Sequence, residues 1–162
     1  HRMSSAASDV YKRQIVANSD GKLLYCKRKN SNNWQFPQGG IDKNEDIFDA
    51  ALRELYEEVG IEENKIKLIK ESDNWYKYDL PKKYKRNSFL WESFKGQKQK
   101  WFLFKLIEET KIDLNNENNP EFDEFNWVDY WKPLDEIVEF KREIYEKVLT
   151  ELEPAYKSEF SK

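Results

Sequence analysis

The residues that could do chemistry gather in one stretch, residues 39–61, which reads GGIDKNEDIFDAALRELYEEVGI. Glu54, Glu57 and Glu58 follow one another at a spacing that places all three carboxylates on one face of a helix. Like charges so close repel, and a bound divalent cation would remove that repulsion. Carboxylate oxygens suit Mg²⁺ or Mn²⁺ better than Zn²⁺. The spacing therefore indicates a metal site. The alternative is an ordinary acidic helix face that is exposed to solvent.

The element that must position these carboxylates can be predicted from the same stretch. Apolar residues recur every fourth position from Ile47 to Val59, which is typical of an amphipathic helix. Gly60 follows directly, where a glycine commonly ends a helix in the left-handed conformation. We therefore predict a helix between Glu45 and Val59, behind a glycine-rich turn.

Further fixed positions make the pattern specific. The stretch fits G-x5-E-x7-R-E-U-x-E-E-x-G-U, in which U is a bulky apolar residue. This pattern is the signature of the Nudix hydrolases, which the region closely resembles. The positions that fit it are Gly39, Glu45, Arg53, Glu54, Leu55, Glu57, Glu58, Gly60 and Ile61.

The resemblance implies metal-assisted hydrolysis of a diphosphate that is linked to some other group. Mg²⁺ is the expected cofactor, with Mn²⁺ or Zn²⁺ as substitutes. Glu121, which follows Pro120 in a loop, belongs to the site by the same resemblance. The implied metal ligands are a backbone carbonyl near Gly39 and the carboxylates of Glu54, Glu57, Glu58 and Glu121.

The resemblance also assigns catalytic roles, although it leaves one of them open. The general base could be Glu54, Glu58 or Glu121, since the assigned base varies within the superfamily. Arg53 is expected to orient the glutamates through charge-assisted hydrogen bonds rather than to touch the substrate.

Segments outside this stretch bear on the substrate. WQFPQGG at 34–40, GQKQKWF at 96–102, PEFD at 120–123 and VEFKR at 138–142 resemble the bacterial RNA pyrophosphohydrolases, which remove pyrophosphate from RNA 5′ ends and thereby favour RNA decay. Asymmetric dinucleoside tetraphosphate hydrolases, which give ATP and AMP, share the first and third segments and are the alternative. A catalytically silent Nudix domain that only binds nucleotides or RNA is a third reading.

Substrate contacts are expected from aromatic and basic side chains. Trp34 and Phe140 offer faces on which a base could stack, although either could pack in the core instead. Positive charge is needed beside the acidic site, because a polyphosphate would otherwise be repelled. The predicted substrate-binding residues are Arg28, Trp34, Tyr78, Gln97, Lys98, Val138, Phe140 and Lys141.

The whole chain restricts the class of protein. At 162 residues it fits one domain. A net charge of −3 and a pI near 5.5 argue against a generally basic nucleic-acid binder. Cys26 is the only cysteine, which excludes an internal disulfide, and no apolar run is long enough to span a membrane. We expect a cytoplasmic monomer.

Residues 1–14, HRMSSAASDVYKRQ, are small and polar and then abruptly basic. We predict that they form a non-native or disordered leader, that residues 15–153 form a single Nudix domain, and that residues 154–162 form a polar tail. Relatives begin the first strand with an arginine that faces the phosphates. Here the first strand is expected to start at Ile15, truncated and without that arginine.

Strand-like runs alternate with two helices along the rest of the chain. This order predicts an α/β fold with a mixed β-sheet packed between helices, and the resemblance implies the same Nudix-type α/β/α sandwich. The second helix is expected after Pro133. The predicted strands are 15–17, 22–27, 66–69, 75–80, 100–107 and 125–128.

Overall fold

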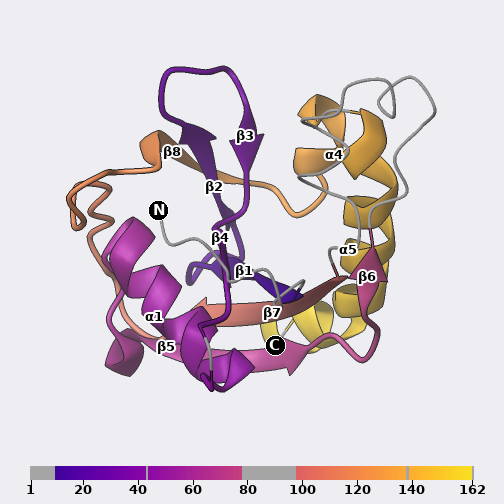
Figure 1. The fold of residues 1–162 in the computed structure, drawn as a ribbon. Helices are drawn as coiled ribbons and strands as arrows, with labels where there is room; N and C mark the ends of the chain where they lie inside the picture. The colour runs from indigo at the N-terminus through magenta and orange to yellow at the C-terminus, as the bar shows by residue number, and fades with distance from the viewer. Residues whose placement is uncertain (1–9, 43, 78–97, 138, 162) are drawn as a thin grey trace.

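The computed structural model describes residues 10–42, 44–77, 98–137 and 139–161 (Figure 1). Their strands are β1 (Val10–Ala17), β2 (Leu23–Arg28), β3 (Trp34–Gln35), β4 (Gln38–Gly40), β5 (Ile66–Glu71), β6 (Tyr76–Lys77), β7 (Lys98–Leu106) and β8 (Phe122–Val128). Their helices are α1 (Ile47–Val59), the 3₁₀ turn η1 (Glu63–Lys65), α4 (Pro133–Glu136) and α5 (Glu139–Phe160).

The described strands form one mixed sheet in the order β3-β2-β1-β7-β5. The central strands β1 and β7 run parallel and pair along all of β1, from Val10 opposite Lys98 to Ala17 opposite Lys105. The other pairs are antiparallel, with β4 on β1, β6 on β7 and β8 on β2. The prediction of a mixed sheet is confirmed.

Two hydrophobic cores lie on the two faces of this sheet. Side chains alternate along a strand, so Ile15 and Trp101 pack in the core beneath α5, whereas Val16 and Phe102 pack in the core beneath α1. The predicted sandwich is therefore confirmed, with α1 and α5 covering opposite faces (Figure 1). No helix in the described residues is both long and apolar enough to cross a membrane.

The start of the domain differs from the prediction. Residues 10–14, predicted to belong to a non-native or disordered leader, are ordered, because β1 begins at Val10 and pairs with β4 on one side and β7 on the other. The side chains of Lys12, Arg13 and Gln14 are almost completely buried. The first strand thus starts at Val10 rather than at Ile15, and its polar residues enter the interior. Residues 1–9 lie outside the described residues.

The end of the domain also differs. The polar tail predicted for residues 154–162 continues α5 as far as Phe160, with Pro154 inside the helix. Tyr156 donates a hydrogen bond to the carbonyl oxygen of Gly21 at 2.6 Å, and its ring lies 4.3 Å from that of Tyr130. Aromatic residues in an otherwise polar segment therefore hold this end against the body.

Candidate active site

The predicted acidic stretch folds as β4, a loop and α1, and both ends of α1 are capped. Asp46 accepts hydrogen bonds from the backbone N–H groups of Phe48 at 3.0 Å and Asp49 at 3.2 Å. At the other end Gly60 has φ 72°, the left-handed conformation expected from the sequence. The caps fix the register of α1, which directs its glutamates toward β4.

Gly39 allows the backbone of β4 to approach one of these glutamates closely. A Cβ atom on Gly39 would lie 2.3 Å from Cδ and 2.5 Å from Oε1 of Glu54. Only glycine fits there without displacing the carboxylate. The strand backbone and the Glu54 carboxylate are therefore neighbours, as the prediction of a ligand near Gly39 requires.

Arg53 links the carboxylates of the stretch. Its Nε donates to Glu45 Oε2 at 2.8 Å, and its Nη1 donates to Glu54 Oε1 at 3.0 Å and to Glu57 Oε2 at 3.2 Å. These bonds raise the pKa of the Arg53 guanidinium, chiefly through Glu45. The contacts are those expected of a residue that orients the glutamates, and this role stays a prediction.

Glu58 is the most deeply buried of the glutamates, at 2% exposure. Its Oε2 accepts a hydrogen bond from the N–H of Gln38 at 3.2 Å, while its Oε1 has no hydrogen-bond partner within the described part of the chain. Burial, followed by the charges of Glu121 and Glu54, raises the pKa of Glu58 well above its usual range. The structure thus brings three predicted carboxylates together.

Two residues that the sequence analysis did not select join this cluster. Lys12, fully buried, donates from Nζ to the carbonyl oxygen of Gly40 at 2.5 Å and lies 3.6 Å from Glu54 Oε1. Burial lowers the pKa of Lys12 to about 8, although the negative charge of Glu54 acts in the opposite direction. Glu117 lies near enough to Glu121 and Glu54 that, after burial, their charges raise its pKa. An isolated polar run before an apolar strand was the only sequence signal for Lys12.

The residues present fit a divalent cation, although they do not form a complete coordination sphere. Among the described residues no three acidic, histidine or cysteine side chains converge on one point, and Arg53 and Lys12 supply the positive charge instead. Three observations nevertheless favour a cation here: all-oxygen donors, the close approach of Gly39 to Glu54, and the buried, unpartnered Oε1 of Glu58. Members of the Nudix family generally need a divalent cation, so these donors are the candidate ligands.

The predicted substrate residues are only partly brought together. The pKa of Lys141 is lowered to about 7, by burial and then by the charges of Arg13 and Arg28, so these three cations share one region. Arg13, a further residue that the sequence analysis passed over, stacks its guanidinium 5.6 Å from the ring of Trp101 on the α5 face. Trp34 lies on the same side, stacked 6.0 Å from Tyr25.

Lys98 lies apart from that group. Strand alternation places it on the face of Phe102, which is the α1 face, and its Nζ lies 4.9 Å from the ring of Trp75. The structure therefore does not join Lys98 to Lys141. Tyr78, Gln97, Val138 and the side chain of Phe140 lie outside the described residues.

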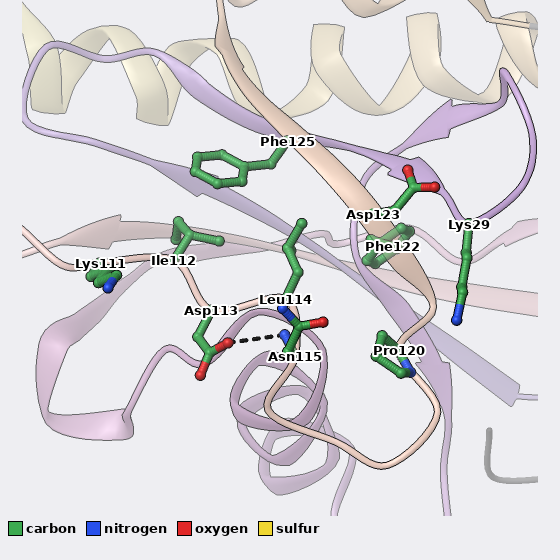
Figure 2. A pocket seen from close by; sticks show the side chains of 10 residues that line it. All are labelled: Lys29, Lys111, Ile112, Asp113, Leu114, Asn115, Pro120, Phe122, Asp123 and Phe125. Carbon is green, nitrogen blue, oxygen red and sulfur yellow. Dashed lines mark hydrogen bonds between the residues drawn. The ribbon is translucent and has the colours of Figure 1, made fainter.

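A separate hollow of about 570 Å³ lies beside this site but not over it. Figure 2 shows Phe125, Ile112 and Leu114 along one part of it and Lys29 beside Pro120 at the other. None of the glutamates of α1 lines this pocket. Three of its lining residues lie next to Glu121: its chain neighbours Pro120 and Phe122, and Lys29, whose backbone N–H donates to the carbonyl oxygen of Glu121 at 2.8 Å.

Known proteins resemble the chain in sequence over most of its length. RNA pyrophosphohydrolase from Actinobacillus pleuropneumoniae serotype 3 is 45% identical over 138 residues, which are 85% of this chain and 67% of that protein. RNA pyrophosphohydrolase from Psychrobacter cryohalolentis is 45% identical over 141 residues, 86% of this chain and 81% of that protein. The corresponding Aliivibrio fischeri protein is 43% identical, over 85% and 81%.

Solved structures support the fold. The Escherichia coli dihydroneopterin triphosphate pyrophosphohydrolase matches with a TM-score of 0.65 at 20% identity, over 88% of this chain and 95% of that one. A Caenorhabditis elegans Ap4A hydrolase complex matches with a TM-score of 0.62 at 16% identity, over 89% and 98%. The profile of the NUDIX domain matches residues 14–148. With its acidic stretch, its sandwich and this match, the chain belongs to the Nudix hydrolase family.

Proposed function

We propose that the protein removes pyrophosphate from the 5′ end of triphosphorylated RNA and leaves a 5′-monophosphate, which favours decay of the RNA. The observation that carries this proposal is the pair of buried carboxylates Glu54 and Glu58, with the charge of Glu121 acting on Glu58, in a chain 45% identical to an RNA pyrophosphohydrolase. The two solved structures are named for other substrates, dihydroneopterin triphosphate and Ap4A, and at their low identity they support only the fold.

The acidic cluster supports binding of a divalent cation, with Mg²⁺ as the proposed ion and Mn²⁺ or Zn²⁺ as substitutes. The ligands would be Glu54, Glu57, Glu58, Glu121 and a carbonyl near Gly39. When bound, the cation neutralises charge on the phosphates and lowers the pKa of a bound water. These oxygens lie on α1, on β4 and directly before β8, so the substrate diphosphate would bind where these three segments meet.

Glu58 is the proposed general base among the three eligible carboxylates. Burial, followed by the charges of Glu121 and Glu54, raises its pKa, which makes it a stronger proton acceptor, as a group that takes a proton from water must be. Arg53 orients the neighbouring glutamates through its hydrogen bonds to Glu45, Glu54 and Glu57.

The cationic region around Lys141, Arg28 and Arg13 is the proposed binding site for the RNA phosphates. Its charges repel one another, so an entering polyphosphate relieves that repulsion, and the cations in turn offset the repulsion between the polyphosphate and the glutamates. Trp34 offers a face for a base. Lys98, Tyr78, Gln97, Val138 and Phe140 stay proposed contacts of the same substrate. All these residues belong to one chain, and we propose a monomer that acts on RNA in the cytoplasm.

Product analysis tests the proposal. The purified protein is offered 5′-triphosphorylated RNA and diadenosine tetraphosphate in parallel, each with Mg²⁺. Formation of monophosphorylated RNA at much the higher kcat/KM supports an RNA pyrophosphohydrolase. Efficient production of ATP and AMP with inert RNA would point to the dinucleoside polyphosphate alternative.

The silent-domain reading is tested by turnover itself. Glu57→Gln should abolish hydrolysis while the circular dichroism spectrum stays that of the parent protein. A parent protein that binds RNA without hydrolysing any phosphoric anhydride would favour the silent domain. Equal hydrolysis by parent and variant would contradict the assigned metal site.

A further inference from the structure

Lys12 contacts both elements that carry the candidate metal ligands. Its Nζ donates to the carbonyl oxygen of Gly40 in β4 and lies 3.6 Å from Oε1 of Glu54 in α1. The side chain is completely buried, so no solvent replaces these contacts. The ammonium group is thus fixed inside the acidic cluster rather than on its rim.

The same two oxygen atoms are contacted by a second cation. Arg53 donates from Nη1 to Glu54 Oε1 at 3.0 Å and from Nη2 to Gly40 O at 3.5 Å. Glu54 Oε1 therefore lies between an ammonium and a guanidinium group. A divalent cation that binds Glu54 must therefore compete for its carboxylate with Lys12 and Arg53. Of these two residues, only Arg53 belongs to the Nudix pattern.

We propose that Lys12 is a resident counter-cation of the acidic site, which holds Glu54 in place without metal and weakens the binding of a divalent cation. It is a positioning residue, because it acts through Glu54 and does not reach the solvent side. This inference rests on the proposed metal-binding role of the cluster. The inference goes beyond that role, because it names a residue of the first strand that sets the affinity for the metal.

Its neighbour on β1 shows why the effect belongs to the charge. Gln14 projects from the same face as Lys12 and donates to the carbonyl oxygen of Ala51 at 3.4 Å, so a neutral amide can also join this strand to α1. A glutamine at position 12 would keep a hydrogen-bond donor for Gly40 and remove only the positive charge. The two contributions of Lys12 can therefore be separated.

The test measures Mn²⁺ binding by titration calorimetry at pH 7, without RNA, for the parent protein and for Lys12→Gln. Removing a unit charge this close to a ligand oxygen should tighten Mn²⁺ binding by about tenfold or more. Thermal unfolding should show a lower midpoint for metal-free Lys12→Gln and a larger upward shift on adding Mn²⁺. A purely structural role would weaken Mn²⁺ binding instead.

Two further variants complete the design. Lys12→Arg keeps the charge and should restore the weaker parental affinity. Lys22→Met removes one positive charge from an exposed lysine that pairs with Asp129, and it should leave Mn²⁺ affinity unchanged. If Lys12→Gln does not fold, Lys12→Met provides the neutral variant.

The outcomes separate the two hypotheses. Equal Mn²⁺ affinities in the parent and the neutral variant would overturn the role of Lys12 and leave the metal site standing. Absence of Mn²⁺ binding in both proteins would overturn the metal site and, with it, this inference. Tighter binding in the neutral variant alone, with Lys12→Arg and Lys22→Met like the parent, would establish it.

Discussion

Glu58 is the site carboxylate that is most deeply buried from solvent. It is buried, one of its oxygens has no partner within the described residues, and the charges of Glu121 and Glu54 act on it. Because a side chain of this kind is costly to keep charged, we propose that it serves chemistry rather than stability.

Glu58→Gln should remove turnover and leave the fold. We expect kcat to fall by about 10²- to 10⁴-fold, the range for loss of a general base. The metal-free protein should be no less stable, because the change removes a buried charge that its neighbours repel. Steady-state hydrolysis of triphosphorylated RNA and urea unfolding measure the two effects.

The matched control is Glu62→Gln, which changes an exposed glutamate just beyond α1. Its kcat and its urea midpoint should equal those of the parent. Residual activity of Glu58→Gln within a factor of a few of the parent would transfer the role of base to Glu54 or Glu121.

Lys141 predicts a pH dependence of substrate binding. Burial and the charges of Arg13 and Arg28 lower its pKa to about 7, so the free enzyme loses this positive charge as pH rises through 7. KM for triphosphorylated RNA should therefore rise above pH 7. In Lys141→Gln, KM should be about tenfold higher at pH 6, in line with a lost charge-assisted hydrogen bond, and should be flatter with pH.

The lowered pKa of Lys141 also makes the free energy of unfolding depend on pH. The unfolded chain holds the Lys141 proton up to about pH 10.4, whereas the folded chain releases it near pH 7, so stability should rise between these two values. Lys141→Gln should reduce this slope in urea unfolding. Lys147→Gln, an exposed lysine on the same helix, should change neither profile. A parental pH profile in Lys141→Gln would remove Lys141 from the RNA-binding set.

At the scale of elements, the contact between β4 and α1 depends on the absence of a side chain at Gly39. In Gly39→Ala the new methyl group would meet the Glu54 carboxylate, at 2.3 Å from its Cδ. We expect a loss of about 1–3 kcal/mol in the free energy of unfolding, the usual cost of overpacking, together with a loss of hydrolysis. Urea unfolding and single-turnover hydrolysis measure these two quantities.

Two comparisons show whether Glu54 is the cause. Adding Glu54→Ala makes room for the methyl group, so the double variant should recover stability by about 0.5 kcal/mol or more relative to additivity. Gly60→Ala strains the left-handed cap at φ 72° and should cost about 1–2 kcal/mol without lowering kcat. Additive Gly39 and Glu54 changes would contradict the close approach.

Local signals explain which elements could be predicted. The helix α1 was predicted with both its ends because its apolar period and its glycine cap lie within one stretch of sequence. Strands β3 and β4 were missed, since two or three residues are too few to show alternation. The start of β1 was missed because Lys12 and Arg13 are buried only through partners far along the chain, at Gly40, Glu54 and Trp101.

At the scale of the whole molecule, alternation of strands and helices was enough to predict the sandwich, and the acidic stretch predicts a metal site that stays a proposal. What could not be predicted is how the ends close the fold. The aromatic residues Tyr156 and Phe160 stand in a polar segment, and only the structure shows that Tyr156 meets Tyr130, Phe160 and the backbone of Gly21.

That closure gives a prediction for stability without a change in chemistry. Tyr156 joins the last turns of α5 to the turn after β1, through its hydrogen bond to Gly21 and its tilted ring contacts with Tyr130 and Phe160. Because the ring is only partly buried, Tyr156→Ala should cost about 2 kcal/mol of unfolding free energy, below the range for a fully buried aromatic residue. Lys157→Ala, at the next and exposed position, should cost almost nothing. Since the glutamates of α1 pack on the other face of the sheet, kcat at 25 °C should be unchanged in both variants. A fall in kcat for Tyr156→Ala would show instead that the two faces of the sheet are coupled.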